Sequence, residues 1–284
     1  MAGVVLFAYI GGMLWRTSRG RPLNAPATFI HPCQPIAAEQ PPSGPGWAHE
    51  LKHDGYRLQI HVRDGRVRLY TMNGADWSKR YPRIVEEATR IKGAAIIDAE
   101  VVCLNPDGVA DFYRLHSRVA DDCAIALGFD LLMHDTDDLR RKPLIERKTA
   151  LAKLVIRSRG GIQYVEHAEG HGDRMFEAVC TFGFEGIVSK RLTSPYRSGP
   201  SKTWIKVKNP KAAAATRVLE GTFESSKSIK QPISPATVTG HPHGIELADE
   251  ITEDDCVVAG HWISLLNYRP LGLNRIVRRF VGSP

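Results

Sequence analysis

The segment Trp204-Ile205-Lys206-Val207-Lys208 has the alternation of a β-strand. Because successive side chains point to opposite faces, Trp204, Lys206 and Lys208 share one face and the apolar residues between them share the other. The apolar face is of the kind that packs on a core, whereas the other face directs two ammonium groups the same way. Adjacent like charges are unfavourable unless an anion lies between them, and a phosphate is the obvious candidate. The segment alone is equally consistent with an edge strand whose lysines face water.

The composition is that of a soluble globular protein. The chain has 284 residues, of which 43% are hydrophobic and 24% are charged, enough for one large or two medium domains. The net charge is +7 and the sequence pI is about 9.2. This basic balance permits a polyanionic partner such as a nucleic acid but does not establish one.

The cysteine and histidine positions argue against a disulfide framework or a zinc centre. No CxxC pair occurs, and none of the 11 histidines pairs with a cysteine at metal-ligand spacing. The thiols are therefore predicted to be buried and reduced, which indicates a cytoplasmic protein. The five cysteines are Cys33, Cys103, Cys123, Cys180 and Cys256.

The start of the chain is an apolar run followed by arginines. Residues 2–15 are mostly apolar, and Arg16, Arg19 and Arg21 follow them. The run is short for a bilayer span, and it lacks the basic start and the small-residue cleavage site of a signal peptide. We expect residues 1–26 to be an N-terminal extension, disordered or with a short buried segment, rather than a membrane anchor.

A β-hairpin is predicted near residues 58–69. Apolar and polar residues alternate on both sides of Asp64-Gly65, which is a type I′ turn signal. One face of this hairpin is expected to be apolar. The other face is expected to be basic and to carry Arg63, Arg66 and Arg68.

Further strands and helices follow without regular βαβ alternation. Periodicity and caps predict helices that begin at Pro82, at Ile145 and at an N-cap formed by Asp173. Strands are predicted at residues 94–104, 126–133, 186–190 and 203–207, with a turn at 105–108. This mixture indicates an α+β fold of mainly antiparallel sheets flanked by helices.

The pattern weakens after Pro210. Residues 225–243 are polar with several prolines and glycines, and residues 257–266 form a short apolar run. No regular series of five strands is recognisable there. We therefore predict one domain over residues 27–212 and an uncertain, partly disordered segment over residues 213–284.

A candidate nucleophile lies at the mouth of the predicted sheet, in Lys52-His53-Asp54-Gly55. An amine attacks only when neutral, so this use of Lys52 requires desolvation or neighbouring cations. Lys206 and Lys208 are candidate cations. On its own, the segment is better explained as a surface lysine in a turn.

Other chemistry-bearing residues lie within or beside apolar strands. Asp98 and Glu100 are two residues apart, hence on one face, and carboxylates inside an apolar strand need a cation, donors or a polar ligand. Glu185 and Lys190 frame another short strand, and Phe129 begins a strand with a ring suited to stacking on a base. The alternatives are a strand with one wet face and an ordinary core phenylalanine.

Taken in order, these segments resemble the covalent nucleotidyltransferase motifs of ATP-dependent DNA ligases, in particular bacterial ligases related to the ligase domain of ligase D. The resemblance runs from about Phe29 to about Pro210. A single KxDG is weak evidence, whereas several motifs in family order are strong. The segments are Lys52-His53-Asp54-Gly55, Asp98-Ala99-Glu100, Phe129-Asp130-Leu131-Leu132, Glu185-Gly186-Ile187-Val188-Ser189-Lys190 and Trp204-Ile205-Lys206-Val207-Lys208.

The resemblance implies a nucleotidyltransferase (ATP-grasp-like) adenylation domain and a role for each residue. Lys52 would attack the α-phosphate of ATP to form lysyl-AMP, with Lys206 and Lys208 on that phosphate. Magnesium would be the metal, because hard oxygen ligands and phosphates suit it. Its ligands would include Glu185 and Asp98. The nucleotide would be bound by Glu50 and Phe129 at adenine, Glu100 at the ribose, Arg57 at sugar or phosphate, and Lys190.

The resemblance further implies that AMP passes to a DNA 5′-phosphate and that a neighbouring 3′-hydroxyl then seals the nick, with Asp54 near that hydroxyl. It implies nicked double-stranded DNA as substrate, a role in DNA repair and recombination, and a nucleoid-associated cytoplasmic location. A repair-protein partner is also implied. We expect a monomer without a membrane association.

Two departures from the family pattern concern the DNA steps. Family members usually have an arginine that grips the 5′-phosphate where this chain has Met72, in Thr71-Met72-Asn73-Gly74. Arg68 is a candidate substitute. Family members also usually carry an OB-fold ending in an RxDK-like motif, and no such motif is recognisable over residues 211–284.

Three functions remain open from the sequence. The first is an ATP-dependent DNA ligase. The second is an RNA ligase or a capping-type guanylyltransferase, which share the lysine chemistry. The third is a catalytically reduced nick-binding protein that retains only salt-sensitive phosphate contacts.

Overall fold

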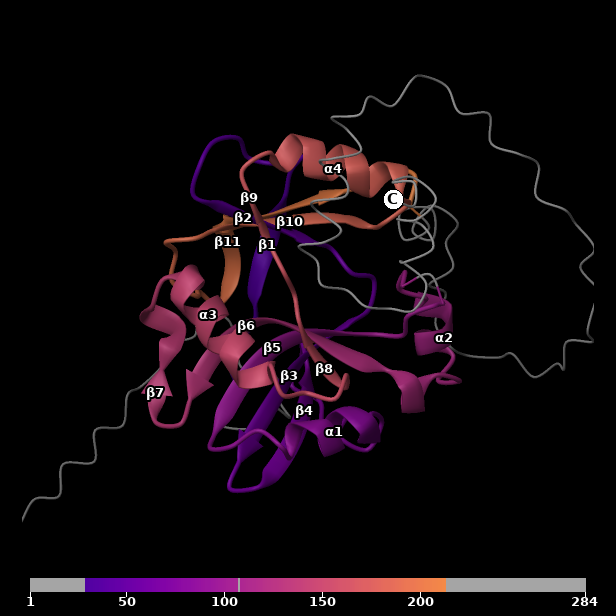
Figure 1. Cartoon of the computed structure of the whole chain (residues 1–284), viewed down its shortest axis with the longest axis vertical. Coiled ribbons are helices and arrows are strands. Elements are labelled where there is room, and N and C mark those ends of the chain that lie inside the picture. The colour runs from indigo at the N-terminus through magenta and orange to yellow at the C-terminus, as the bar shows by residue number, and fades with distance from the viewer. Residues whose placement is uncertain (1–28, 107, 213–284) are drawn as a thin grey trace, which may run out of the picture.

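The computed structural model describes residues 29–106 and 108–212, which form two facing β-sheets with helices on their outer sides (Figure 1). The predicted extension over residues 1–26, the segment over residues 213–284 and the question of an OB-fold all lie outside the described residues. Asp107, in the predicted turn, also lies outside them.

The first sheet has five strands and carries the lysine-rich segment on its β11. Its order is β1 (Cys33–Ala37), β11 (Gly199–Lys208), β10 (Gly186–Arg191), β2 (Trp47–Leu51) and β9 (Ala168–Glu169). Only the β1–β11 pairing in this sheet is parallel. Helix α4 (Gly172–Thr181) covers its outer face (Figure 1), where Met175 and Val179 pack with Ile187 and Val207.

The second sheet has six strands and supplies the opposite wall. Its order is β4 (Arg66–Thr71), β3 (Tyr56–Arg63), β5 (Ala95–Val102), β6 (Ile125–His134) and β7 (Asp137–Asp138), and β8 (Ile162–Tyr164) pairs in parallel with β6. Helices α1 (Pro82–Ala88) and α3 (Leu144–Val155) pack on the same buried cluster as β3 and β5. The remaining helices are short, namely α2 (Phe112–His116), η1 (Asp121–Cys123) and η2 (Leu139–Arg141).

The two sheets are joined by a small apolar cluster. Trp204 of β11 and Cys33 of β1 pack with Ile96 of β5 and Leu132 of β6, and Tyr196 completes the contact. All five of these side chains are nearly inaccessible to solvent. The cluster holds the sheets together beside the residues predicted to carry the chemistry.

Most local predictions are confirmed. Asp64 and Gly65 have φ of 51° and 71°, as a type I′ turn requires, and the hairpin pairs Arg63 with Arg66. Pro82 occupies the first turn of α1. Within the described residues the pairing is mainly antiparallel, so the predicted α+β architecture is confirmed.

Two local predictions are wrong. Asp173 does not cap α4, because His171, with φ of 48°, holds the N-cap position and Asp173 lies in the first turn. The hairpin is not basic along one whole face, because Gln59 and His61 are buried. The two side chains bond to each other, and Gln59 also bonds to the backbone of Ile30, so the segment that precedes β1 covers this part of the face.

Candidate active site

Lys52 lies immediately after β2, at an edge of the space between the sheets. Its backbone N–H donates to the carbonyl of Gly186 at 2.9 Å, which continues the β2–β10 pairing by one residue. Its Nζ donates to Glu185 Oε2 at 2.6 Å. The Lys52 side chain is 22% exposed and that of Glu185 only 7%, so the lysine side chain is partly exposed while its carboxylate partner is buried.

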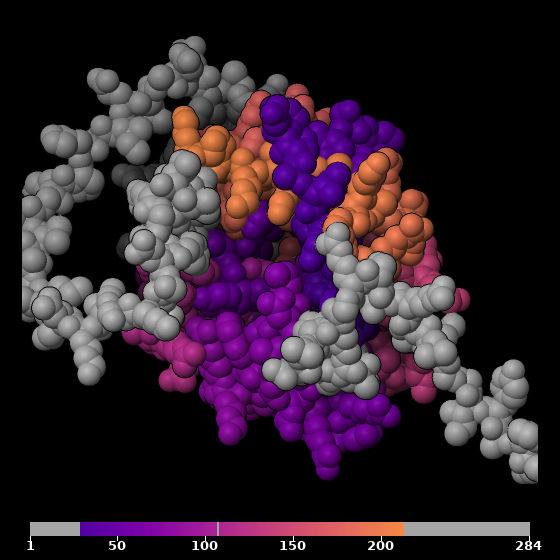
Figure 2. Space-filling model, turned by 180° about the vertical axis from the view of Figure 1, so that it is seen from behind, coloured from indigo at the N-terminus to yellow at the C-terminus, as the bar shows by residue number. Residues whose placement is uncertain are grey.

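A cleft of about 260 Å³ opens in front of Lys52 between the two sheets. Figure 2 shows a hollow bordered by the orange atoms of β11 and the purple atoms of the second sheet. The cleft is lined by Pro35, Glu50, Leu51, Lys52, His53, Arg57, Met72, Glu100, Phe129, Val165, Val188, Lys190, Trp204 and Lys206.

The structure thus brings most predicted site residues to one cleft. Asp54, Asp98, Glu185 and Lys208 are not among the lining residues. Glu185 nevertheless bonds Lys52, and its Oε1 lies 4.0 Å from Lys208 Nζ. The side chain of Lys208 is 48% exposed, so Lys208 stands at the rim.

Phe129 reaches the cleft because β6 carries a bulge. Asp98 pairs with Asp130 and Ala99 pairs with Gly128, which leaves Phe129 as the extra residue. A bulge of this kind re-aims a side chain relative to regular alternation. The Phe129 ring packs edge-to-face against Trp204 with centroids 6.0 Å apart, and Val188 of β10 lines the same cleft.

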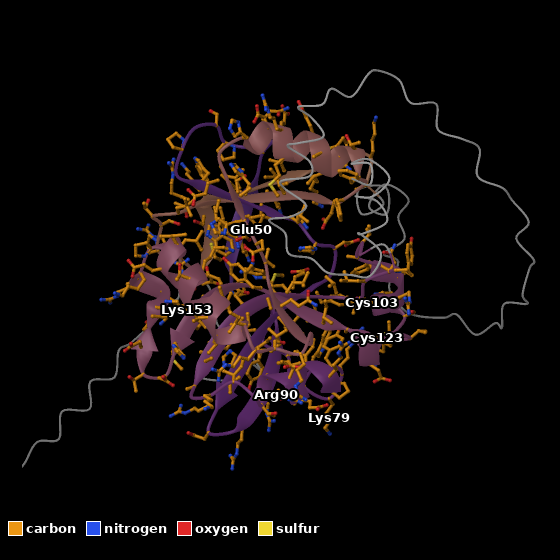
Figure 3. The ribbon with its side chains drawn as sticks, viewed as in Figure 1. Glu50, Lys79, Arg90, Cys103, Cys123 and Lys153 are labelled. Atoms are coloured by element: carbon orange, nitrogen blue, oxygen red, sulfur yellow. The ribbon has the colours of Figure 1, made fainter. Side chains whose placement is uncertain are left out.

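Glu50 lines the same cleft and lies between two lysines, where the two sheets face each other (Figure 3). Its Oε1 accepts from Lys148 Nζ at 2.6 Å, and its Oε2 lies 2.5 Å from Lys190 Nζ. Burial alone would raise the pKa of Glu50, but the two ammonium groups hold the pKa below its ordinary value. Glu50 is therefore an ionised hydrogen-bond acceptor.

Lys190 is itself nearly inaccessible and faces aromatic rings. Its Nζ lies 4.3 Å from the Phe129 centroid and 4.2 Å from the Trp204 centroid. Burial lowers the pKa of Lys190, and the neighbouring Glu50 carboxylate opposes that change. The ammonium is stabilised by the carboxylate and by the ring faces.

Arg57 and Asp98 form a buried bidentate pair. Arg57 Nε and Nη2 donate to the two oxygens of Asp98 at 3.0 and 2.7 Å, and the Tyr196 hydroxyl donates to Oδ2 at 2.6 Å. Asp98 has no accessible surface. The predicted metal role of Asp98 is therefore not supported, because its carboxylate is enclosed and serves to hold Arg57 at the cleft wall.

The surroundings of Glu100 and Lys206 in the cleft shift the pKa values of both side chains. Burial raises the pKa of Glu100 to about 8, against the opposing effect of Lys52 and Arg57. Burial and the nearby Lys52 and Lys208 charges lower the pKa of Lys206. A cation-rich, partly desolvated site of this kind favours a polyphosphate ligand.

The residues present fit a magnesium ion only in company with phosphates. Among residues 29–106 and 108–212, no group of three or more His, Cys, Asp or Glu side chains is arranged to hold a metal. Magnesium is commonly bound by one or two carboxylates together with substrate phosphates and water. Glu185, beside Lys52 and Lys208, is a carboxylate of that kind, and burial raises its pKa.

Met72 lines the cleft and is 45% exposed, so it occupies the cleft mouth. Arg68, considered as a substitute for the missing arginine, pairs with Asp76 at 3.4 Å and is not a lining residue. The structure therefore does not place Arg68 in the position that Met72 occupies.

Sequence reasoning missed several residues of the cleft. His53, Val165 and Val188 line it. Lys148 lies outside the lining and donates a hydrogen bond to Glu50. Val188 was detectable as an inward-facing position of a quoted strand. Lys148 was not, because a lysine on a helix is normally solvated.

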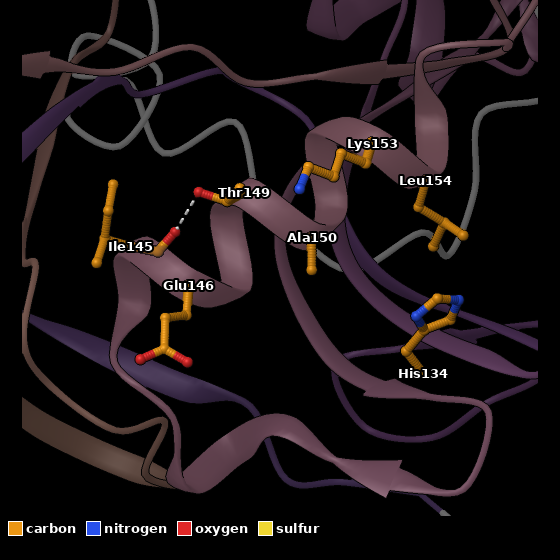
Figure 4. Close-up of a pocket in the computed structure, with 7 residues that line it drawn as sticks. All are labelled: His134, Ile145, Glu146, Thr149, Ala150, Lys153 and Leu154. Carbon is orange, nitrogen blue, oxygen red and sulfur yellow. Dashed lines mark hydrogen bonds between the residues drawn. The ribbon is translucent and has the colours of Figure 1, made fainter.

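A larger hollow of about 500 Å³ lies on the outer face of α3 and is separate from the cleft (Figure 4). Its lining includes Ile145, Lys153, Leu154 and His134. No residue is shared between the linings of the two spaces. The chemistry-bearing residues converge on the smaller cleft, which is therefore the candidate active site.

Comparison with known proteins assigns the class. Residues 33–208 match the family model described as the ATP dependent DNA ligase domain. The chain therefore belongs to the family of ATP-dependent DNA ligase domains, as its motifs predicted, and the prediction of an enzyme of the DNA ligase class is confirmed at the family level.

Among curated relatives, the chain is 38% identical over 186 residues to the multifunctional non-homologous end joining protein LigD of Pseudomonas aeruginosa, covering 63% of this chain and 22% of that protein. It is 34% identical over 180 residues to a DNA ligase of Pyrobaculum calidifontis, covering 56% of this chain and 30% of that protein. The chain thus spans less than a third of either relative.

Solved structures show the same fold. The ligase domain of M. tuberculosis LigD matches with a TM-score of 0.56 and 28% identity, covering 63% of this chain and 59% of that one. A mycobacterial DNA ligase D complexed with ATP and MES matches with a TM-score of 0.55 and 28% identity, covering 63% and 60%. The predicted nucleotidyltransferase-type fold is confirmed. In the described part of the chain, no helix is long and apolar enough to cross a membrane.

Proposed function

We propose that the protein is an ATP-dependent DNA ligase that forms a covalent lysyl-AMP at Lys52 and uses it to seal nicks in duplex DNA. One observation carries the proposal: Lys52 lines a cleft, its Nζ is bonded to buried Glu185, and Lys206 lines the same cleft. The family of the chain and the ATP complex of a structural neighbour support the choice of nucleotide.

In the first step the Lys52 amine attacks the α-phosphate of ATP. A P–N bond forms, the P–O bond to pyrophosphate breaks, and the amine proton goes to Glu185, whose Oε2 lies 2.6 Å from Nζ. Lys206 and Lys208 stabilise negative charge that develops on the phosphate. A magnesium ion at Glu185 would supply charge neutralisation for the leaving pyrophosphate.

The cleft wall would bind the nucleoside part of ATP. Phe129 and Val188 offer apolar surfaces for the base, and the ionised Glu50 accepts a hydrogen bond from the adenine amine. Glu100 lies at the ribose position expected from the motif order, and Arg57 is fixed by Asp98 near sugar or phosphate.

In the later steps a DNA 5′-phosphate attacks the lysyl-AMP phosphorus and releases Lys52. A 3′-hydroxyl then forms the phosphodiester bond and releases AMP, with Asp54 beside that hydroxyl. We propose nicked duplex DNA in repair and recombination as the substrate, with the protein acting as a nucleoid-associated monomer that recruits a repair partner. We further propose that residues 27–212 form the adenylation domain.

The test is covalent labelling of the full chain. With α-labelled ATP and Mg²⁺, we expect an acid-labile adduct that is lost in Lys52→Ala and retained in Lys79→Ala, a matched change at an exposed lysine far from the cleft (Figure 3). A label that survives in Lys52→Ala contradicts the proposal. Labelling by GTP but not ATP supports a capping-type enzyme instead, and no label with either supports a nick-binding protein.

A further inference from the structure

Lys148 of α3 is a buried lysine close to the base end of the cleft. It has no accessible surface, and its Nζ donates to Glu50 Oε1 at 2.6 Å and to the Val165 carbonyl at 2.9 Å. The same Nζ lies 4.6 Å from the centroid of the Tyr164 ring. A buried ammonium is costly unless it is fully partnered, and Lys148 has a carboxylate, a carbonyl and a ring face.

The partners of Lys148 belong to opposite walls of the cleft. Glu50 lies in β2 of the five-stranded sheet. Val165 follows β8, and its N–H donates to Gly128 of β6 in the six-stranded sheet at 2.8 Å. Glu50 and Val165 both line the cleft, whereas Lys148 does not. Lys148 therefore links two lining residues from outside the space that a nucleotide would fill.

The charges around Glu50 make its orientation depend on Lys148. Lys190 Nζ lies 2.5 Å from Oε2, on the cleft side, over the Phe129 and Trp204 rings. With Oε1 held by Lys148, the carboxylate plane is constrained from two directions. Without Lys148, Lys190 alone would draw the carboxylate toward itself, and the acceptor presented to a base would no longer be fixed.

A fixed carboxylate distinguishes bases by their exocyclic groups. An ionised carboxylate only accepts hydrogen bonds, so it favours the 6-amine of adenine and disfavours the 6-oxo group of guanine. Discrimination of this kind is large when a polar site group is left without a partner by the wrong ligand.

We propose that Lys148 is a positioning residue that holds Glu50 for recognition of the exocyclic amine of the base, and thereby sets the preference for ATP. The proposal rests on the function proposed above. It assigns to Lys148 an effect on nucleotide selection that is separate from the Lys52 chemistry.

The test compares Lys148→Met with Lys148→Arg in the full chain. Lys148→Met keeps the length of the side chain but removes the charge and the hydrogen bonds. The control is Lys153→Met, the same change on the exposed side of the same helix (Figure 4). Initial rates of self-adenylylation are measured with ATP, with GTP and with purine riboside triphosphate, which lacks the 6-amine.

We expect Lys148→Met to raise the KM for ATP about tenfold or more, the effect of one hydrogen bond to a charged group, with kcat changed less than about threefold. The preference for ATP over purine riboside triphosphate falls by the same factor, and discrimination against GTP weakens. Lys148→Arg restores part of the preference, and Lys153→Met behaves as the wild type. In a Glu50→Gln background, Lys148→Met has no further effect on the preference.

Three results would overturn the proposal. A folded Lys148→Met protein with an unchanged base preference overturns it, as does an equal loss of preference in Lys153→Met. If Lys148→Met does not fold, Lys148→Gln, whose shorter side chain carries no charge, is measured instead, and an unchanged preference in that variant also overturns the proposal. A wild-type chain that takes no label overturns the proposed function itself, whereas normal labelling with unaltered preference removes only the role of Lys148.

Discussion

Gly55 shows how a single residue shapes the loop that carries Lys52. A Cβ at this position would lie 2.1 Å from the Val101 carbonyl oxygen of β5. The φ of Gly55 is not in the left-handed region, so the glycine is required by close approach of two chain segments rather than by a tight turn. The loop is thereby packed against the second sheet, and Lys52 is held at the junction of the two sheets.

His61 is expected to make stability fall in acid. Burial lowers the pKa of His61 from 6.5 to about 4. Between these values the unfolded chain takes up a proton that the folded chain does not, so stability is lost as pH falls through this window. In His61→Phe we expect the loss of unfolding free energy between pH 7 and pH 4.5 to shrink by about 2 kcal/mol.

Urea unfolding at the two pH values measures the effect of His61→Phe. His134→Phe, at a histidine whose side chain is 39% exposed, is the matched control. An unchanged pH dependence in His61→Phe would show that the pKa of His61 does not differ between the folded and unfolded chain.

Met72 is expected to limit the DNA steps more than the nucleotide step. It is 45% exposed at the mouth of the cleft, where a thioether offers no charge to a phosphate. Met72→Arg should raise the rate of nick sealing about tenfold, since a hydrogen bond to a charged group contributes about 1.5–3 kcal/mol. Self-adenylylation should change less than twofold.

Sealing of a labelled nicked duplex and labelling by ATP are measured on the same Met72→Arg preparation. Met72→Lys supplies the charge without the planar fork, and we expect it to give a smaller gain. Equal sealing by the wild type and both variants would contradict the role given to this position.

At the scale of elements, β6 and α3 determine which side chains reach the cleft. β6 departs from regular pairing twice, between Ile96 and Ile97 and between Asp98 and Ala99 of its partner β5. The second bulge delivers Phe129 to the cleft. Periodicity of two predicts the strand but not the bulge, because a bulge depends on how the partner strand packs.

The buried charged residues of α3 could not be predicted from the sequence. Periodicity predicted the helix that begins at Ile145, and its Leu151 and Val155 are buried. Arg147 and Lys148 are also buried, and their carboxylate partners, Asp130 and Glu50, lie 17 and 98 residues away in the chain. Helical periodicity treats such residues as solvated, so the motifs predicted most of the charged residues that line the cleft but not the buried partners that hold them.

The Arg147–Asp130 pair is expected to be a main determinant of how α3 docks on β6. Arg147 Nε and Nη2 donate to Asp130 at 2.7 and 2.8 Å, both side chains are inaccessible, and Nη1 donates to two backbone carbonyls. Arg147→Met leaves a buried carboxylate without its partner and should cost about 3–5 kcal/mol of unfolding free energy.

The double variant Arg147→Met with Asp130→Leu removes the stranded charge and should recover part of that loss. Both are compared with Lys153→Met by urea unfolding. A loss below about 1 kcal/mol in Arg147→Met would show that the pair contributes little to docking.

At the scale of the whole molecule, the residues proposed to bind a nucleotide come from both sheets and from no single contiguous segment. Glu50, Lys190 and Lys206 belong to the five-stranded sheet, and Arg57, Glu100 and Phe129 belong to the six-stranded sheet. The joining cluster around Trp204 lies beside them. Nucleotide binding should therefore stabilise the packing of one sheet on the other, because it adds contacts to both walls.

A fragment of residues 27–212 is expected to fold by itself and to form lysyl-AMP. Every residue found to line the cleft, with Glu185 and Lys208, falls within this range, and so do the buried clusters that pack the two sheets and α4. We expect residues 213–284 to add contacts to DNA, so the fragment should seal nicks at least tenfold more slowly than the full chain. Cooperative urea unfolding, ATP labelling and sealing of a nicked duplex check the three statements in turn. Labelling that requires residues 213–284 would contradict the proposed domain boundary, and Lys52→Ala in the fragment controls for adventitious label.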